Sequence, residues 1–329
     1  MEIYKINLQL FAGTPNTNVT SDSALSAEMK TFYDMNLIDE ASAQLVHDQF
    51  GQKRPIPKNG GKTIEFRKFS SLPKALTALT EGVTPDGKKL TVTNVTATVS
   101  QYGDYIVQSD VLELTALDNT ILEATKILGK QAGLTLDTVV RNVLMTGTSV
   151  QVAGGKTRST LTATDKLTVK EIQKAVAFLR ANNAPTINGD YVAIIHPYAA
   201  YDLMRDPDWV DAFKYANPEN LYTGEIGKIS GVRFVQTSEA KIYTGSGCPS
   251  GLAVFCTLVL GEGAYGITEI TGGGLETIVK QKGSGGTADP LDQRSSVGWK
   301  ALKTAEILVQ NYMVRIESCS EYSATATAN

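Results

Sequence analysis

Three glycines in the stretch GEIGKISGVRFVQTSEA, residues 224–240, raise the question of a phosphate-binding loop. Gly224, Gly227 and Gly231 give the spacing G-x-x-G-x-x-x-G, whereas the dinucleotide fingerprint is G-x-G-x-x-G and the P-loop ends in Gly-Lys-Ser/Thr. A phosphate loop also opens a helix, but this stretch runs into the strand-like residues 232–235. The pattern therefore predicts a turn that leads into a strand, without a bound nucleotide.

The residue types that carry hydrolytic or metal chemistry are sparse. The histidines are His47 and His196, and no Gly-x-Ser-x-Gly motif presents a serine nucleophile. Cys248, Cys256 and Cys319 are widely spaced with no histidine beside them, which does not suit zinc, and their odd number favours a reducing compartment. We interpret His196, between an apolar stretch and a proline, as a strand-end residue that makes a local hydrogen bond. The sequence predicts no catalytic residue, no metal site and no cofactor.

Aromatic and basic side chains could instead form a binding surface. Trp209 and Phe213 could stack on a base or a sugar, although local packing or a subunit contact would use them equally. The basic residues near position 67 could touch phosphates, but they alternate with apolar residues, which also fits a segment lying across a neighbouring protein. The candidate assembly contacts are Lys62, Arg67, Lys68, Lys74, Trp209 and Phe213.

Length and composition restrict the class of protein. A chain of 329 residues with 42% hydrophobic residues can bury a sizeable core and is long enough for about two domains. The net charge of −3 argues against a surface that binds nucleic acid by neutralising many phosphates. The longest apolar run, residues 252–260, is about half the ~20 residues that span a bilayer, so we expect a buried strand there. No signal peptide is apparent, and we expect the protein to be made and used inside a cell.

Charge divides the first 75 residues into two blocks. Residues 1–50 contain two basic and seven acidic residues, a balance of 2 − 7 = −5, and their apolar spacing over 23–50 predicts an interrupted helix. Residues 51–75 contain seven basic residues and one acidic residue, a balance of 7 − 1 = +6. Adjacent blocks of opposite sign indicate an arm and a loop that meet charged surfaces elsewhere, or simply two solvated faces.

Residues 57–106 have the pattern of a long hairpin. Ile64 and Phe66 alternate with charged residues, as in a half-exposed strand, and a return strand begins near Leu90. Pro85-Asp86-Gly87 supplies turn chemistry between them. A two-stranded projection is marginally stable alone, so this one needs another surface to lie on.

A long helix and an α/β segment follow. Apolar residues step by three or four from residue 120 to 146, which predicts a helix ~40 Å long, and Gly129 and Gly133 inside it indicate close packing. The later chain predicts an α+β fold, with a disordered tail from residue 323. The expected elements are a helix ending near 182 and strands at 191–195, 232–235, 252–260, 265–270, 275–281 and 306–317.

Several stretches, in this order, resemble a tailed-bacteriophage major capsid protein of the Hong Kong 97-like fold, within the N-four-like coat protein family. They are residues 6–12 (INLQLFA), 60–66 (GGKTIEF), the His196-Pro197 junction, 224–240 and 292–300 (DQRSSVGWK). The resemblance covers nearly the whole chain. It implies an N-terminal arm (1–56), an extended E-loop (57–106), a peripheral domain with a long spine helix (107–160), an axial α/β domain (161–284), and a return to the peripheral sheet with a flexible tail (285–329).

The resemblance also implies a function and partners. Such proteins are not enzymes; they self-assemble as hexamers and pentamers into an icosahedral shell that encloses packaged double-stranded DNA. The implied partners are other copies of the chain, a portal, scaffold or decoration proteins, and DNA by non-specific contact, without a membrane. The implied location is the virion capsid, assembled in the bacterial host cytoplasm. Two alternatives remain open, an encapsulin-like nanocompartment shell and an α/β enzyme acting on a small ligand.

Overall fold

One of the two main parts of the molecule is a five-stranded sheet backed by one long helix. The computed structural model describes residues 37–41, 45–69, 72–79, 81–84, 86–115, 120–216, 227–271, 273–284 and 289–329. The sheet has the order β1-β11-β13-β12, and β4 also pairs with β13. Its strands are β1 (Gln52–Lys53), β4 (Ser100–Ser109), β11 (Tyr265–Glu269), β12 (Glu276–Lys280) and β13 (Arg294–Ile307).

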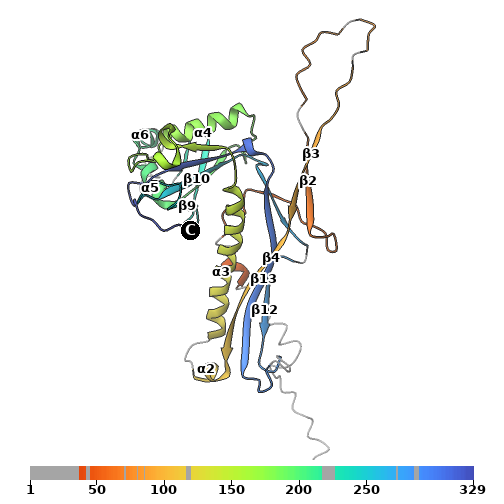
Figure 1. Ribbon diagram of the computed structural model, residues 1–329, viewed down its shortest axis with the longest axis vertical. Helices are drawn as coiled ribbons and strands as arrows, with labels where there is room; N and C mark the ends of the chain where they lie inside the picture. The colour runs from red at the N-terminus through yellow and green to blue at the C-terminus, as the bar shows by residue number, and fades with distance from the viewer. Residues whose placement is uncertain are drawn as a thin grey trace, which may run out of the picture.

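The long helix α3 (Thr120–Leu144) confirms the periodicity seen in the sequence. Its apolar stripe, Leu128, Ala132 and Leu136, packs on Val297 and Trp299 of β13. Figure 1 shows the helix running along the sheet, with the short α2 (Asp110–Thr115) at the lower end. Because alternate residues of β13 point to opposite faces, only one face of this sheet is covered by α3.

The close packing expected at Gly129 is made by a short helical segment, residues 37–41. Residues 37–41 are helical and lie against α3, with Leu37 fully buried. A Cβ on Gly129 would lie 2.9 Å from the carbonyl oxygen of Leu37 and 3.0 Å from the Cβ of Glu40. A glycine is therefore needed for this short helix to approach α3.

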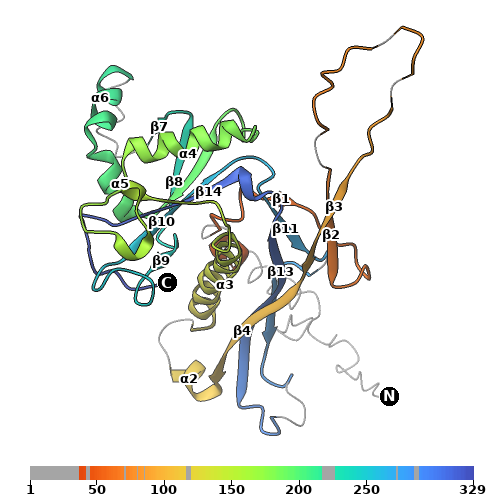
Figure 2. The same cartoon turned by 45° about the horizontal axis from the view of Figure 1, so that its top comes forward.

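A seven-stranded sheet forms the second half. Its order is β5-β14-β10-β6-β8-β7, and β9 also pairs with β10. All residues of β10 are buried, as the apolar run at 252–260 predicts. Three helices, α4 (Val169–Ala181), α5 (Pro197–Met204) and α6 (Pro207–Ala216), accompany this sheet (Figure 2). The strands are β5 (Val150–Val152), β6 (Tyr191–Ile195), β7 (Lys228–Ile229), β8 (Val232–Gln236), β9 (Ile242–Tyr243), β10 (Val254–Leu260) and β14 (Met313–Ser318).

Strand pairing differs from the expected division at 161–284 and 285–329. Strands β11 and β12 lie in the five-stranded sheet, because both pair with β13. The expected single strand at 306–317 is two strands, β13 and β14, separated by a 3-10 turn at Gln310–Tyr312, and β14 pairs with β10 in the other sheet. The chain thus crosses between the sheets at 261–264 and again at 308–312.

The expectation of a disordered, flexible tail from residue 323 is wrong. The backbone N–H of Ala253 donates to the carbonyl of Ala324 at 2.7 Å. The side-chain oxygen of Asn329 accepts a hydrogen bond from Ile242 N at 2.9 Å, and its amide donates to Ala240 O at 3.0 Å. The tail thus supplies acceptors for the backbone N–H groups of Ile242 in β9 and Ala253 just before β10.

Candidate functional site

The most exposed feature is a two-stranded ladder that extends beyond both sheets. Strands β2 (Thr63–Phe69) and β3 (Val92–Thr98) pair antiparallel in unbroken register, from Thr63 opposite Thr98 to Phe69 opposite Val92. We call the ladder together with the residues that join its strands the projection (residues 63–98). Figures 1 and 2 show the projection standing apart from the seven-stranded sheet and its helices.

One aromatic ring fixes the ladder to the five-stranded sheet. Phe66 is 3% exposed, and a Cβ on Gly266 of β11 would lie 2.7 Å from two carbons of its ring. The guanidinium of Arg54 lies over the same ring, 5.8 Å from its centroid. Because Gly266 has no side chain, the ring can lie directly on the backbone of β11. This contact supplies the surface that the hairpin was expected to need.

Removing this ring should release the ladder. We expect Phe66→Ala to cost about 3–5 kcal/mol of local stability, the range for truncating a buried Phe, while both sheets stay folded. Limited proteolysis should then cut after Lys62 or Arg67 at least tenfold faster than in the wild type. The matched control is Phe178→Ala on α4, whose side chain is 39% exposed. Equal cleavage of both variants would contradict the assignment.

Beyond the ladder, the projection displays apolar side chains to solvent. The exposed fractions of these residues lie between 53% and 86%, so the fold of one chain buries none of them. Single exposed apolar residues are common, but a run of them on one extended segment indicates a surface that is covered in an assembly. The residues are Leu72, Leu76, Leu79, Val83 and Leu90.

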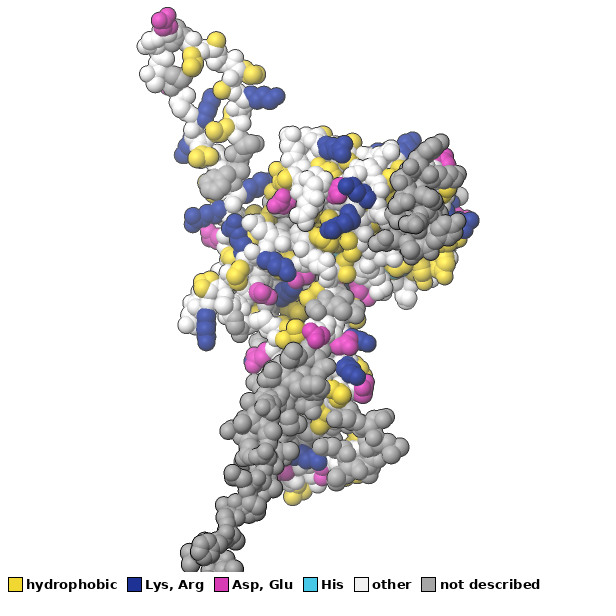
Figure 3. Space-filling model, turned by 180° about the vertical axis from the view of Figure 1, so that it is seen from behind, with side chains coloured by type: hydrophobic (Ala, Val, Ile, Leu, Met, Phe, Trp, Pro, Cys, Tyr) yellow, Lys and Arg dark blue, Asp and Glu magenta, His cyan; other side chains and the backbone are white. Residues whose placement is uncertain are grey.

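Four of the six candidate contact residues lie on this projection or at its base. Lys62, Arg67, Lys68 and Lys74 are all exposed. In the described part of the chain, no carboxylate lies within ion-pair distance of these four side chains. Figure 3 shows Lys and Arg side chains gathered where the projection meets the rest of the molecule. Cations that pair with no described carboxylate, beside exposed apolar residues, form a surface suited to an acidic and apolar partner.

The aromatic candidates are not brought to this surface. Trp209 on α6 is 4% exposed and packs edge-on against Phe234 of β8, with ring centroids 5.4 Å apart. Trp209 is therefore a core residue, and its prediction as an assembly contact is wrong. Phe213 belongs to α6, but its side chain lies outside the described residues.

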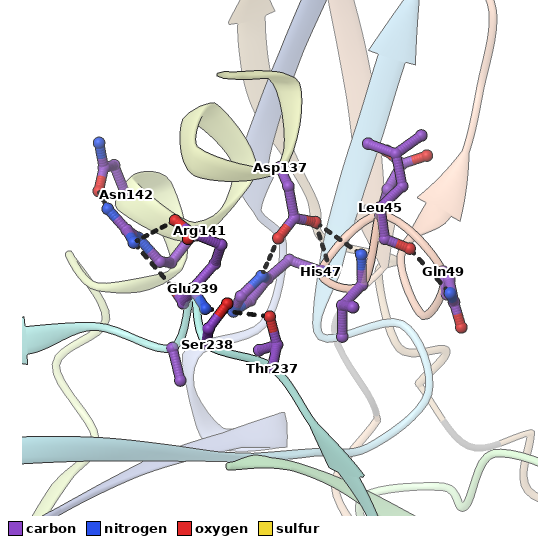
Figure 4. Close-up of polar contacts among 12 residues, drawn as sticks. Leu45, His47, Gln49, Asp137, Arg141, Asn142, Thr237, Ser238 and Glu239 are labelled. Atoms are coloured by element: carbon purple, nitrogen blue, oxygen red, sulfur yellow. Dashed lines mark hydrogen bonds and ion pairs between the residues drawn. The ribbon is translucent and has the colours of Figure 1, made fainter. Parts of the chain in front are cut away.

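A buried polar junction, which the sequence did not indicate, joins the chain just before β1 to α3. Asp137 and His47 are fully buried, and His47 Nδ1 lies 2.6 Å from Asp137 Oδ2. The other oxygen of Asp137 accepts the backbone N–H groups of Val46 and His47, at 2.9 and 2.7 Å. Figure 4 shows the two side chains pointing toward each other below the helix. One carboxylate thus fixes the chain just before β1.

Arg141, one helical turn after Asp137, extends this junction to the seven-stranded sheet. Its Nη1 donates to the carbonyl of Glu239 at 2.8 Å and lies 3.7 Å from the Glu239 carboxylate (Figure 4). Burial lowers the pKa of Arg141, and the negative charges of Glu239 and Asp137 oppose that shift. The three charged side chains connect the arm, the long helix and the loop after β8.

A second buried network lies where β14 meets the segment after β5. Glu317 is 1% exposed and is bound by two arginines, by Arg158 Nη2 at 2.5 Å and by Arg315 Nε at 3.0 Å. The hydrogen bond to Glu317 raises the pKa of Arg158. Arg158 also lies 4.0 Å over the ring of Tyr243. These groups bind one another and form a closed ion-pair network around the Glu317 carboxylate.

The structure confirms His196 as a strand-end residue. It follows β6, its Nδ1 accepts the backbone N–H of Tyr198 at 3.1 Å, and it caps α5. It is 7% exposed and packs on Phe255. Burial lowers the pKa of His196, so the folded chain favours the neutral ring.

This shift predicts a loss of stability in acid. The unfolded chain binds a proton at His196 with a pKa of about 6.5, whereas the folded chain resists it, so stability should fall as the pH drops below about 6.5. One proton changes the free energy of unfolding by at most about 1.4 kcal/mol per pH unit. We expect His196→Asn, which keeps a helix-capping side chain, to show a smaller stability difference between pH 7.5 and pH 5 in urea unfolding. An unchanged difference would show that other groups cause the acid sensitivity.

The glycine-rich stretch is a turn and a strand, as predicted, over its described residues. Ile229 pairs with Val232, and the two residues between them, Ser230 and Gly231, have φ values of 53° and 78°. Two positive φ values in a two-residue loop are the signature of a type I′ hairpin. Gly224 lies outside the described residues.

The described residues also form no metal site and no helix of membrane-spanning character. Within the described ranges, no group of three or more His, Cys, Asp or Glu is placed to hold a metal ion. None of the described helices is both long and apolar enough to cross a membrane. A hollow of about 440 Å³ lies over β4, β12 and β13, with Tyr105, Ile278 and Gly298 in its wall. Its lining includes no histidine or cysteine.

Comparison with known proteins identifies relatives of this architecture. A family model described as phage capsid protein matches residues 91–312, which is more than half of the chain. No curated protein sequence matches it. The capsid of cyanophage Pam1 is 13% identical with a TM-score of 0.65, and the match covers 85% of this chain and 92% of the other.

Two further solved structures show the same fold. The capsid of Ralstonia phage GP4 is 13% identical with a TM-score of 0.64, over 84% of this chain and 88% of the other. A virus-like particle from Pyrococcus furiosus is 11% identical with a TM-score of 0.52, over 88% and 99%.

Proposed function

The chain belongs to the phage capsid protein family, and we propose that its copies assemble as hexamers and pentamers into an icosahedral shell around packaged double-stranded DNA. Family membership gives the chain a structural, shell-forming role. The observation that carries the proposal is the projection. It presents an apolar segment and cations that form no ion pair with a described carboxylate, and its ladder rests on its own chain at buried residues that include Phe66 and Ala97.

The projection meets the physical requirements of a contact between copies. Its exposed leucines supply apolar area to bury, and Arg67 and Lys68 supply charges that set register and exclude wrong partners. A contact in which one surface meets a different surface of the next copy generates rings, as hexamers and pentamers require. We therefore propose that residues 57–106 contact the neighbouring subunit. The seven-stranded sheet with α4–α6 would lie at the centre of each ring.

The same proposal extends to partners and location. The shell would be part of the virion, assembled in the host cytoplasm, with a portal and with scaffold or decoration proteins as further partners. DNA contact would be non-specific, in keeping with the net charge of −3. The likeness to the Pyrococcus furiosus particle keeps a nanocompartment shell as the second candidate, because the fold alone does not separate the two.

Negative-stain microscopy with sizing chromatography tests the proposal. The protein is expressed alone and together with its neighbouring genes. Closed shells, or rings of five and six, would support it, and packaged nucleic acid would favour a virion over a nanocompartment. A stable monomer under every condition would contradict it and would favour the α/β enzyme, which a stabilising small ligand would then identify.

A further inference from the structure

Two of the three cysteines lie at one small core cluster, although they are far apart in the sequence. Cys319, directly after β14, is 1% exposed and packs with Leu161 and Val254. Cys248, in the loop between β9 and β10, is half-buried and packs against the same cluster. The two positions are 319 − 248 = 71 residues apart, and both side chains are free thiols. The fold thus brings together two thiols that no local pattern in the sequence joins.

Electrostatics also places the two sulfur atoms near each other. Burial, with smaller contributions from the negative charges of Asp165 and Cys248, raises the pKa of Cys319 to about 11. The Coulomb interaction falls with distance, so one thiolate affects another thiol only where the two are close. This agrees with the packing of both cysteines on one cluster.

The strand register excludes Cys256 as the partner of Cys319. Cys256 lies opposite Glu317, two residues before Cys319, so the two cysteines are diagonal neighbours across the strand pair. Diagonal Cβ atoms are roughly 7 Å apart, whereas a disulfide needs about 3.5–4.5 Å between its Cβ atoms. Cys256 cannot shift toward Cys319, because β14 holds it on one side and its N–H donates to the carbonyl of Lys241 at 2.9 Å on the other.

The loop that carries Cys248 can adjust to the geometry of a disulfide. Gly245 and Gly247 have φ values of 79° and 82°, and a Cβ on either would meet no neighbour within 4 Å. Glycine adopts a wide range of φ, so the turn before Cys248 can change without a steric cost. Cys319 is fixed by its N–H, which donates to the carbonyl of Asp165 at 2.9 Å. One sulfur is therefore anchored, and the loop can bring the other to it.

We propose that Cys248 and Cys319 form a disulfide within one chain when the folded protein is oxidised. With hydrogen peroxide as the oxidant, the half-buried sulfur of Cys248 reacts first and becomes a sulfenic acid, with release of one water. The sulfur of Cys319 then attacks that of Cys248, the S–O bond breaks, and the hydroxyl leaves with the thiol proton as a second water. Two thiols are oxidised, and one peroxide is reduced to two waters.

The bond would close a ring of chain that passes through both sheets. The segment between the two cysteines contains β10 to β14, of which β11, β12 and β13 belong to the five-stranded sheet. Linking the ends of so long a segment restricts the unfolded chain and stabilises the folded one. The bond needs only one chain, but its timing rests on the proposed function. A shell assembled in a reducing cytoplasm would keep the thiols free and would be oxidised after it leaves the cell.

Oxidation of the purified chain tests the bond. The protein is treated with one equivalent of hydrogen peroxide at pH 8.5, because burial raises the pKa of the Cys248 thiol and the thiolate is the reacting form. Free thiols are then counted in denaturant, and the intact mass is measured. The matched variants are Cys248→Ser, which removes one partner, and Cys256→Ala, which removes a cysteine outside the bond.

The wild type should fall from three free thiols to one and lose the mass of two hydrogens. Cys256→Ala should fall from two thiols to none, and Cys248→Ser should keep both of its thiols. The oxidised wild type should melt at least about 5 °C above the reduced protein, and dithiothreitol should reverse the shift.

Two other outcomes would overturn the disulfide. One is a wild type that gains oxygen at Cys248 while Cys319 keeps its thiol, and the other is cross-linking between chains in place of the bond within one. These measurements need no shell, so they stand apart from the test of the proposed function. Failure of the disulfide would leave shell assembly standing, and failure of assembly would leave the disulfide standing.

Discussion

Reversing the charge of Arg67 and Lys68 is expected to abolish shell assembly while the subunit still folds. Both side chains are exposed on β2 and have no ion pair with a described carboxylate, so the double variant Arg67→Glu, Lys68→Glu should change subunit stability by no more than about 0.5 kcal/mol. At an interface that complements them, reversed charges cost several kcal/mol per contact, repeated in every copy.

Microscopy of the double variant tests its assembly, and a thermal melt tests its folding. We expect no closed particles and an unchanged melting temperature. The exchange Arg67→Lys, Lys68→Arg keeps both charges and should still assemble, which separates charge from side-chain shape. Normal particles from the charge-reversed protein would remove these two residues from the interface.

Truncating Asp137 is expected to destabilise the subunit more than any surface change. Asp137→Ala leaves His47 and two backbone N–H groups without their buried acceptor, and it removes a negative charge near the cation of Arg141. Breaking a buried pair by removing one partner typically costs about 3–5 kcal/mol. We expect a loss of that size in denaturant unfolding, with much of the protein insoluble on expression.

Two variants on α3 sharpen this test. Asp137→Asn keeps one oxygen acceptor and should lose less stability than Asp137→Ala. Glu123→Ala removes a carboxylate that is 58% exposed and paired with Lys126, and should cost no more than about 0.5 kcal/mol. If Asp137→Ala behaved like Glu123→Ala, the junction would have no structural role.

The helices and the hairpin were predictable because their signals are local. The three- and four-residue steps from 120 onward gave α3, and alternation at Ile64 and Phe66 gave β2. Sheet membership was not predictable in the same way. Strand β14 pairs with β10 about 60 residues earlier, and nothing in either strand's own sequence records that partner. The expected division at 161–284 and 285–329 failed for this reason.

Some features of the candidate site could likewise be predicted from the sequence, and others could not. Exposed cations such as Arg67 follow from alternation along a half-buried strand, so the sequence placed them correctly on the surface. Trp209 was misplaced because an aromatic residue on a helix fits a core and an interface equally. The junction of His47 with Asp137 joins residues 90 positions apart and has no local signature. A buried Asp on the apolar side of a predicted helix was the one signal that could have indicated it.

Hydrogen exchange would test most directly whether the projection is the surface that copies share. Backbone amides of the described residues between 72 and 91 belong to no helix or strand, so they should exchange quickly in the free subunit. In assembled shells we expect their exchange to slow at least tenfold, while α3, already folded in one chain, exchanges alike in both states. Equally fast exchange of residues 72–91 in shells and in free subunits would contradict the assignment of the projection to a neighbouring copy.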